Sequence, residues 1–303
     1  MNQHSAVFLA SLVSAVVAWG TVRWTSAEHI QPSTQPSQDT YDRVQKTGVL
    51  RCGYVSYPPG LTKDPRTGQV SGIFPDVLRE IGQNLGFKVQ WSEEVGWGTM
   101  VEGLNSGRYD AICSPVWPIP QRIRVADFTV PLYYSGAEAY IRPNDKRFAA
   151  SLGALNDPQM RIATTDGEAS DAIASADFPN AQRISTPQLT DVSQLLLMVA
   201  TNKADATFIE PYIAHQFLKS NPGSLEPARP GVPLRLYPNV MMLRQQDDRL
   251  RRILDNAITD LENNGYIEKI LDQNEPYRGA FYRKPLPIEP AGAANAIQGA
   301  SKL

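Results

Sequence analysis

The sequence predicts an α/β protein with two lobes, each built on a mostly parallel sheet. Short apolar runs alternate with amphipathic helical stretches along most of the 303 residues, which is the pattern of strand–helix–strand units. The chain is also long enough for two domains of common size. A second series of strands and helices begins at Arg161.

Apolar runs bounded by turn residues predict the strands of the first lobe, and an apolar period of 3.6 residues predicts its helices. From Pro75 to Leu85 the apolar residues share one helical face, and Gly86 follows at the C-cap position. The predicted strands are 49–55, 87–91 and 109–113, and the predicted helices are 75–85 and 99–104.

The same alternation continues in the second half. Residues 247–263 form a clearly amphipathic helix, Asn264 and Gly265 cap it, and a last short helix covers 266–271. The other predicted elements are strands at 161–165 and 206–209 and helices at 169–176, 189–200 and 212–218.

The stretch from Gly107 to Gly136 contains the most distinctive pattern. A buried strand is followed by Pro115, Pro118 and Pro120, which predict a shaped loop, because proline fixes φ and removes a backbone donor. Arg122 comes at the end of that loop, where its planar guanidinium can meet a carboxylate or a phosphate. A lone arginine in such a place is more often a surface residue.

The residues after Arg122 favour a binding arginine over a surface arginine. DFT at 127–129 and PLYY at 131–134 follow at set distances. This block resembles the strand–loop–Arg–(V/A)DF(S/T)xPYY block of the family 3 extracellular solute-binding proteins, and further matches in order extend the resemblance from Tyr41 to Tyr277. It implies two doubly wound lobes joined by a two-strand hinge, the type 2 periplasmic binding protein fold. The implied boundaries are 41–138 and 239–283 for lobe 1, and 139–238 for lobe 2.

The resemblance also implies a ligand cleft between the lobes. Arg122 would hold a ligand carboxylate, and Glu210, at the family's ammonium-binding position, would face it from the other lobe. Without the resemblance, core packing would explain the aromatic residues, and Glu210 would be a helix N-terminal acid. The residues implied to bind ligand are Tyr57, Trp97, Ser114, Trp117 and Arg122 in lobe 1, and Glu168 and Glu210 in lobe 2.

Two departures from the family pattern bear on the ligand. Pro115, Trp117 and Ile119 stand where the family carries small hydroxyl residues, and Glu168 stands where a helix begins with threonines. A carboxylate at that helix start argues against a second ligand carboxylate there. The sequence therefore favours a ligand with one acid group, an apolar or cationic body, or a solute that is not an amino acid.

The N-terminal region indicates export. Residues 6–22 are apolar and uncharged, and Thr25-Ser26-Ala27 offers a signal-peptide cleavage site, although the preceding segment lacks lysine and arginine. An uncleaved membrane anchor is the alternative for residues 1–27. Residues 28–40 are expected to form a linker, and residues 284–303 a disordered tail.

Catalysis and cofactors receive little support. No metal-ligand spacing, phosphate loop or dinucleotide motif is present, so we expect no cofactor and no metal. The formal net charge of −2, with mixed signs, gives no indication of a nucleic-acid surface, and we expect no nucleic-acid partner. In the implied fold Cys52 and Cys113 would lie on neighbouring strands, where an oxidising compartment would allow a disulfide. Adjacent parallel strands give poor disulfide geometry, so we expect two buried thiols.

The prediction is a monomeric solute-binding protein without enzymatic activity. It would capture a small polar solute, an amino acid or a related compound, outside the cytoplasmic membrane and deliver it to an ABC permease. Contact with the membrane would be through the N-terminal segment only. The alternatives are a membrane-anchored sensory or scaffold module and a dehydratase-like enzyme of the same fold, in which Glu210 would be the general acid.

Overall fold

The computed structural model describes residues 39–148, 151–188 and 190–285, all within one compact unit, Asp39–Leu303. The predicted signal peptide or anchor lies outside the described residues, as do nearly all of the predicted linker and tail. In the described part of the chain, no helix combines the length and apolar character that a membrane span needs.

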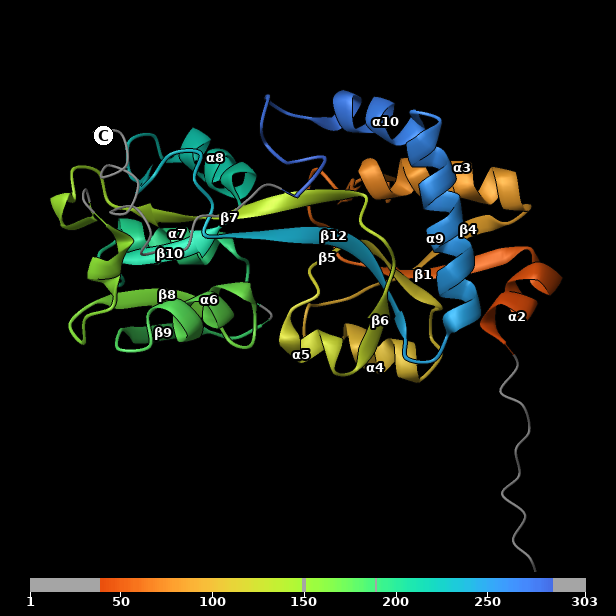
Figure 1. Cartoon of the computed structure of the whole chain (residues 1–303), viewed down its shortest axis with the longest axis horizontal. Coiled ribbons are helices and arrows are strands. Elements are labelled where there is room, and N and C mark those ends of the chain that lie inside the picture. Colours follow the sequence, from red (N-terminus) through yellow and green to blue (C-terminus); the bar gives the residue numbers. More distant parts are fainter. Residues whose placement is uncertain (1–38, 149–150, 189, 286–303) are drawn as a thin grey trace, which may run out of the picture. The chain divides into compact units, whose positions relative to one another are not determined.

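Most of the described strands form one large sheet with two parallel halves, and β2 and β3 pair in a small separate sheet (Figure 1). In lobe 1, β1 is parallel to β4 and β5, and in lobe 2, β8 is parallel to β9 and β10. The order across the sheet is β4 (Lys88–Glu94), β1 (Val49–Tyr54), β5 (Ala111–Val116), β12 (Arg235–Arg244), β7 (Tyr133–Ile141), β10 (Ala206–Ile209), β8 (Arg161–Thr165) and β9 (Gln182–Thr186). The α/β prediction is confirmed.

Two long antiparallel strands, β7 and β12, connect the halves. Residues 133–137 of β7 pair with residues 235–239 of β12. Beyond this shared segment, β7 pairs with β10 of lobe 2, while β12 pairs with β5 and with β6 (Ala126–Phe128) of lobe 1. Each strand thus passes from one lobe into the other, which confirms the two-strand hinge (Figure 1).

Helices cover the sheet, and apolar clusters fill the space between. In α9, four buried residues recur every three or four positions, Leu250, Leu254, Ile258 and Leu261, and each contributes about 1.5–3 kcal/mol by leaving water. Around lobe 1 lie α2 (Thr40–Thr47), α3 (Ile73–Leu85), α4 (Met100–Asn105), α5 (Pro120–Ile123), α9 (Asp248–Asn263) and α10 (Tyr266–Asn274).

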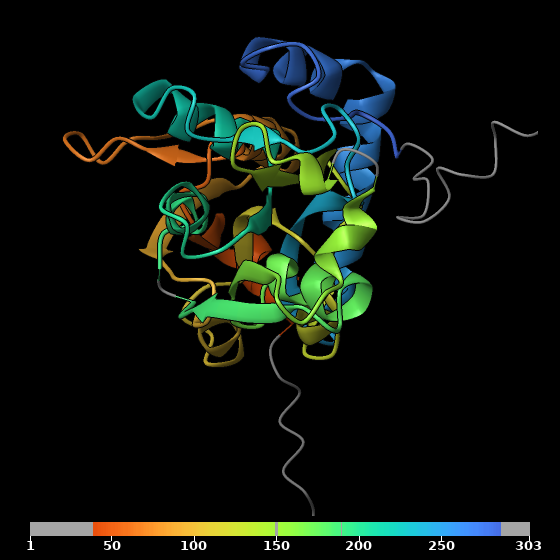
Figure 2. The ribbon, with the colours of Figure 1, turned by 90° about the vertical axis from the view of Figure 1, so that its left-hand side faces the viewer.

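In lobe 2, helices lie on both faces of the strands, as in a doubly wound sheet (Figure 2). Ile162 of β8 packs in the cluster that contains Ile173 of α6, while its neighbour Ala163 packs in the cluster that contains Leu196 of α7. These helices are α6 (Ala169–Asp177), α7 (Ser193–Ala200) and α8 (Pro211–Ser220). The shorter elements are β2 (Thr62–Lys63), β3 (Val70–Ser71), β11 (Glu226–Pro227) and 3₁₀ turns at Lys146–Phe148 and Leu152–Leu155.

Three predicted details are wrong. Strand β5 continues through Pro115, where its pairing with β12 shifts register and so tolerates a residue without an N–H, and Pro120 begins a helix rather than ending a loop. The helix α2 begins at Thr40, with the Asp39 side chain as its cap, so these two residues are not linker.

The third correction concerns the cysteines. Cys52 and Cys113 form a disulfide, with their Cα atoms 5.5 Å apart. The residue opposite Cys52 in the ladder is Ala111, so Cys113 lies two positions further along β5. That offset keeps both side chains on the same face, in the same core cluster, at a separation that a disulfide can span.

Candidate ligand-binding site

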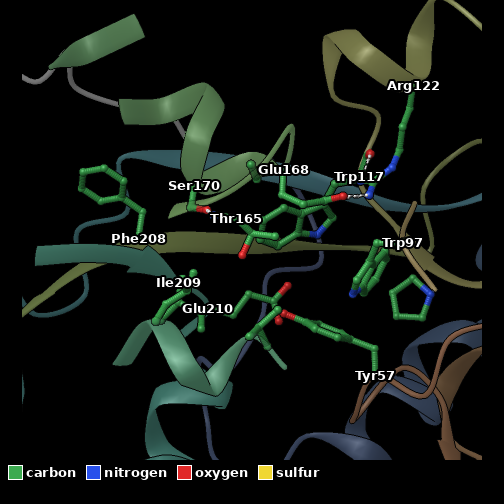
Figure 3. A pocket seen from close by; sticks show the side chains of 14 residues that line it. Tyr57, Trp97, Trp117, Arg122, Thr165, Glu168, Ser170, Phe208, Ile209 and Glu210 are labelled. Atoms are coloured by element: carbon green, nitrogen blue, oxygen red, sulfur yellow. Dashed lines mark hydrogen bonds and ion pairs between the residues drawn. The ribbon is translucent and has the colours of Figure 1, made fainter. Parts of the chain in front are cut away.

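A cavity lies where the carboxyl ends of the parallel strands of both lobes meet, which is where open α/β sheets bind ligands. Its volume is about 610 Å³ when the open mouth is included. From lobe 1 it is lined by Tyr57, Trp97, Pro115, Trp117 and Arg122. From lobe 2 it is lined by Thr165, Glu168, Ala169, Ser170, Val192, Leu195, Phe208, Ile209 and Glu210 (Figure 3).

The topology explains why these residues converge. Thr165 ends β8, and Glu168 is the N-cap residue of α6 a short turn later. Ile209 ends β10, and Glu210 is the N-cap residue of α8. Each pair therefore projects from a strand end and a helix start toward lobe 1, which presents Arg122 from α5.

Arg122 forms an ion pair with Glu168 across the two lobes. Its Nη2 donates to both carboxylate oxygens of Glu168, at 2.6 and 2.7 Å, and its Nη1 donates to the Trp117 carbonyl at 3.3 Å (Figure 3). The guanidinium also lies over the Trp97 ring, 5.3 Å from the centroid. Burial raises the pKa of Glu168, and the positive charge of Arg122 opposes that rise. The sequence placed Glu210 opposite Arg122, whereas the structure gives Arg122 the carboxylate of Glu168.

Glu210 is in a different situation. Its side chain is buried, and its Oε1 has no hydrogen-bond partner among the described residues. Burial raises the pKa of Glu210 to about 8, although the hydroxyls of Ser135 and Tyr57 act against the rise. A buried polar atom without a hydrogen-bond partner destabilises the folded protein by about 1–3 kcal/mol. A proton on Glu210, or a ligand cation beside it, would remove that penalty.

Aromatic rings form much of the remaining wall. Tyr57 meets Trp97 edge to face at 5.5 Å between centroids. Trp117 stacks on Tyr237 of the hinge strand β12 at 4.4 Å, and its Nε1 donates to Asn239 Oδ1 at 3.1 Å. These contacts fix the rings and leave the cavity with an apolar, flat-walled interior.

Six of the seven residues implied by the sequence line this cavity, and Ser114 does not. Ser114 is fully buried in β5, where its Oγ accepts a hydrogen bond from the Val55 N–H at 3.1 Å. Sequence reasoning missed Thr165, Phe208 and Ile209. Their position at the ends of predicted strands could have indicated that they line the cavity. Val192 and Leu195, within the stretch predicted as a helix at 189–200, also line the cavity, and both pack in the apolar cluster around α7.

Comparison with known proteins gives the same picture of the fold. Residues 50–274 match the family model of bacterial extracellular solute-binding proteins, family 3. A probable amino-acid ABC transporter-binding protein of Haemophilus influenzae is 28% identical over 183 residues, 60% of this chain and 68% of the relative. Cyclohexadienyl dehydratase of Pseudomonas aeruginosa is 20% identical over 246 residues, 81% of this chain and 90% of the enzyme.

A solved structure has the same fold. It is that of an ancestral amino acid-binding protein, described as a precursor of cyclohexadienyl dehydratase. It aligns with a TM-score of 0.65 at 23% identity, over 78% of this chain and 99% of the ancestral one. With a family match over most of its length and an interlobe cavity at the strand ends, this chain belongs to the bacterial extracellular solute-binding proteins, family 3.

Proposed function

We propose that the protein captures a small polar solute, an amino acid or a related compound, between its lobes and presents it to an ABC importer. The observation that supports this most is the cavity between the lobes, where Arg122 of one lobe meets Glu168 of the other. A solute held there contacts both lobes at once, so binding favours the closed form. A permease can then distinguish the loaded protein from the empty one by its shape.

The ligand class is suggested by the relatives together with the cavity. The Haemophilus relative carries an amino-acid transport name, and the ancestral protein is described as amino acid-binding. Here the described lining combines three charged residues, Arg122, Glu168 and Glu210, with several aromatic rings. A compound with one charged group and a compact apolar body suits that combination.

Enzymatic activity is the second candidate, and one observation favours it. Burial raises the pKa of Glu210 to about 8, which is the property of a general acid at neutral pH, and one relative is a dehydratase. We nevertheless propose binding without turnover, because the other two charged residues of the described lining, Arg122 and Glu168, are paired with each other. Incubation with cyclohexadienyl substrates tests this choice, and product formation that Glu210→Gln abolishes would establish the enzyme instead.

The place of action is proposed to be outside the cytoplasmic membrane, with the protein acting as a monomer. The family is extracellular by description. Residues 1–27 would be either a signal peptide or an anchor, and an anchor would favour the sensory or scaffold alternative. Cell fractionation followed by N-terminal sequencing distinguishes them, since a start near Glu28 means cleavage and an intact Met1 in membranes means an anchor. Recovery from the cytosol would refute both.

Ligand capture itself is tested by a thermal-shift screen of amino acids, amines and carboxylates on the purified full-length chain. A true ligand at a hundredfold excess over its Kd adds about 2.7 kcal/mol to the free energy of unfolding. Calorimetry then confirms one site per chain. The proposal is wrong if no small polar solute stabilises the folded protein.

A further inference from the structure

The guanidinium of Arg122 has its acceptors within the chain. Both oxygens of Glu168 and the carbonyl of Trp117 accept hydrogen bonds from it, and its face covers Trp97. The side chains of Arg122 and Glu168 are 8% and 17% exposed, so the pair is largely removed from water. A ligand carboxylate would have to displace Glu168 from Arg122 and leave that carboxylate buried without its partner, which is unfavourable.

The carboxyl group of Glu210, unlike the guanidinium of Arg122, is not fully hydrogen-bonded by the described residues. Glu210 is 4% exposed, and its Oε1 lacks a partner among the described residues. In Figure 3 its carboxyl group lies on the opposite side of the cavity from the Arg122–Glu168 pair, next to Tyr57. Because the charges of Arg122 and Glu168 cancel, Glu210 is the remaining ionisable carboxyl group of the described lining, and its ionised form favours a cation.

The rest of the lining supplies surface for an apolar body. Trp117, Leu195, Phe208 and Ile209 are part of the wall, and their side chains carry no charge. The hydroxyl of Thr165 is already within 3.2 Å of that of Thr186. The cavity therefore combines one carboxyl group that an ammonium can ionise with apolar walls, and it lacks an unoccupied cation among its described residues.

We propose that the cavity takes an organic amine that has an apolar body and carries no carboxylate. The ammonium group binds Glu210, the apolar body lies against Trp117 and Phe208, and the Arg122–Glu168 pair closes the lobes without touching the ligand. Glu168 thus sets the specificity for the ligand, because it pairs with Arg122, which would otherwise bind the acid group of a ligand. This inference rests on the proposed function and narrows its ligand class.

The test compares matched compounds on the full-length chain by calorimetry. The pairs are phenethylamine with phenylalanine, isoamylamine with leucine, cadaverine with lysine and agmatine with arginine. We expect the best amine to bind at least about tenfold more tightly than its parent amino acid. If the amino acids bind more tightly, the inference is wrong while the proposed function stands. If neither class binds, the inference is wrong, and the broader thermal-shift screen decides whether the proposed function stands.

Two variants test the roles of Glu168 and Glu210 separately. Glu168→Ala frees Arg122 and is expected to reverse the preference, raising affinity for the parent amino acid at least about tenfold. Glu210→Gln is expected to weaken amine binding at least about tenfold, whereas the matched control Glu262→Gln, at an exposed position of α9, leaves it unchanged. Circular dichroism checks the fold of each variant, and the isosteric Glu168→Gln replaces the alanine variant if that one unfolds. An unchanged preference in a folded Glu168 variant would overturn the inference.

Discussion

At the scale of single residues, the two carboxyl groups of the cavity differ because of their neighbours. Glu168 has a bidentate arginine partner, whereas Glu210 is buried with an unpartnered oxygen. The titratable side chains that face Glu210 are Tyr57, Tyr133 and Tyr277, and burial raises the pKa of each above its ordinary value near 10. Glu210 is therefore the member of this group that titrates near neutral pH.

That assignment predicts proton release on binding. With a pKa of about 8, Glu210 of the empty cavity is about nine-tenths protonated at pH 7, whereas an ammonium ligand favours the carboxylate. Binding should then release about 0.9 proton at pH 7, and affinity should rise about tenfold per pH unit below pH 7 and about fivefold between pH 7 and pH 8. Calorimetry in two buffers of different ionisation enthalpy measures the proton count. No release, or equal release by Glu210→Gln, would contradict the account.

Arg122 gives a second prediction at this scale. Arg122→Ala leaves Glu168 without its partner in the closed form, so closure and binding should weaken by about 2–5 kcal/mol, or about thirtyfold to several thousandfold. Arg122→Lys should not restore affinity, because Glu168 and the Trp117 carbonyl accept from two different guanidinium nitrogens, Nη2 and Nη1, whereas lysine has a single nitrogen. Titration calorimetry decides, and a folded Arg122→Ala protein with parental affinity would show that the ion pair plays no part in binding.

At the scale of elements, the hinge strand β12 also shapes the cavity. Asn239 is fully buried in it, and its Nδ2 donates to Ser135 Oγ of β7 at 2.8 Å while its Oδ1 accepts from Trp117. One amide thus ties the two hinge strands together and fixes an aromatic wall.

Asn239→Ala should therefore affect stability and affinity together. It leaves Ser135 and the Trp117 N–H without this partner, at about 1–3 kcal/mol for each buried group. Asn263→Ala, at an exposed position of α9, is the control. Urea unfolding gives the stability and calorimetry the affinity. A large loss of stability without any loss of affinity would mean that Trp117 does not depend on this amide for its position.

The elements also show what sequence can predict. Strands β8 and β10 have the predicted bounds, because short apolar runs between turn residues define them locally. Strand β9 was missed, since its residues Gln182–Thr186 are half exposed and lack that pattern. Six cavity-lining residues were named from the family resemblance, whereas Thr165, Phe208 and Ile209 at the ends of predicted strands were not. The Arg122–Glu168 pair could not be predicted, because it depends on how closely the lobes approach, and the disulfide depends on a two-residue offset between strands.

At the scale of the whole molecule, the disulfide cross-links two strands of lobe 1, whereas the lobes are connected to each other by the two hinge strands. Cys52 and Cys113 are 61 residues apart, and closing such a loop stabilises a fold by about 2–4 kcal/mol. The double variant Cys52→Ala/Cys113→Ala should lose about that much in urea unfolding. Reduction of the parent should give a similar loss, and equal stability with and without reductant would show that the bond contributes nothing.

The central claim is capture of a solute by closure of two lobes, and small-angle scattering of the full-length chain tests it most directly. The Arg122–Glu168 pair alone is expected to hold the lobes weakly, because a buried ion pair gains little net free energy. A ligand that contacts both lobes adds to it and shifts the population to the closed form. The account predicts a smaller radius of gyration at saturating ligand and no change with a compound that does not bind. An unchanged radius with a ligand that calorimetry shows to be bound would contradict capture by closure.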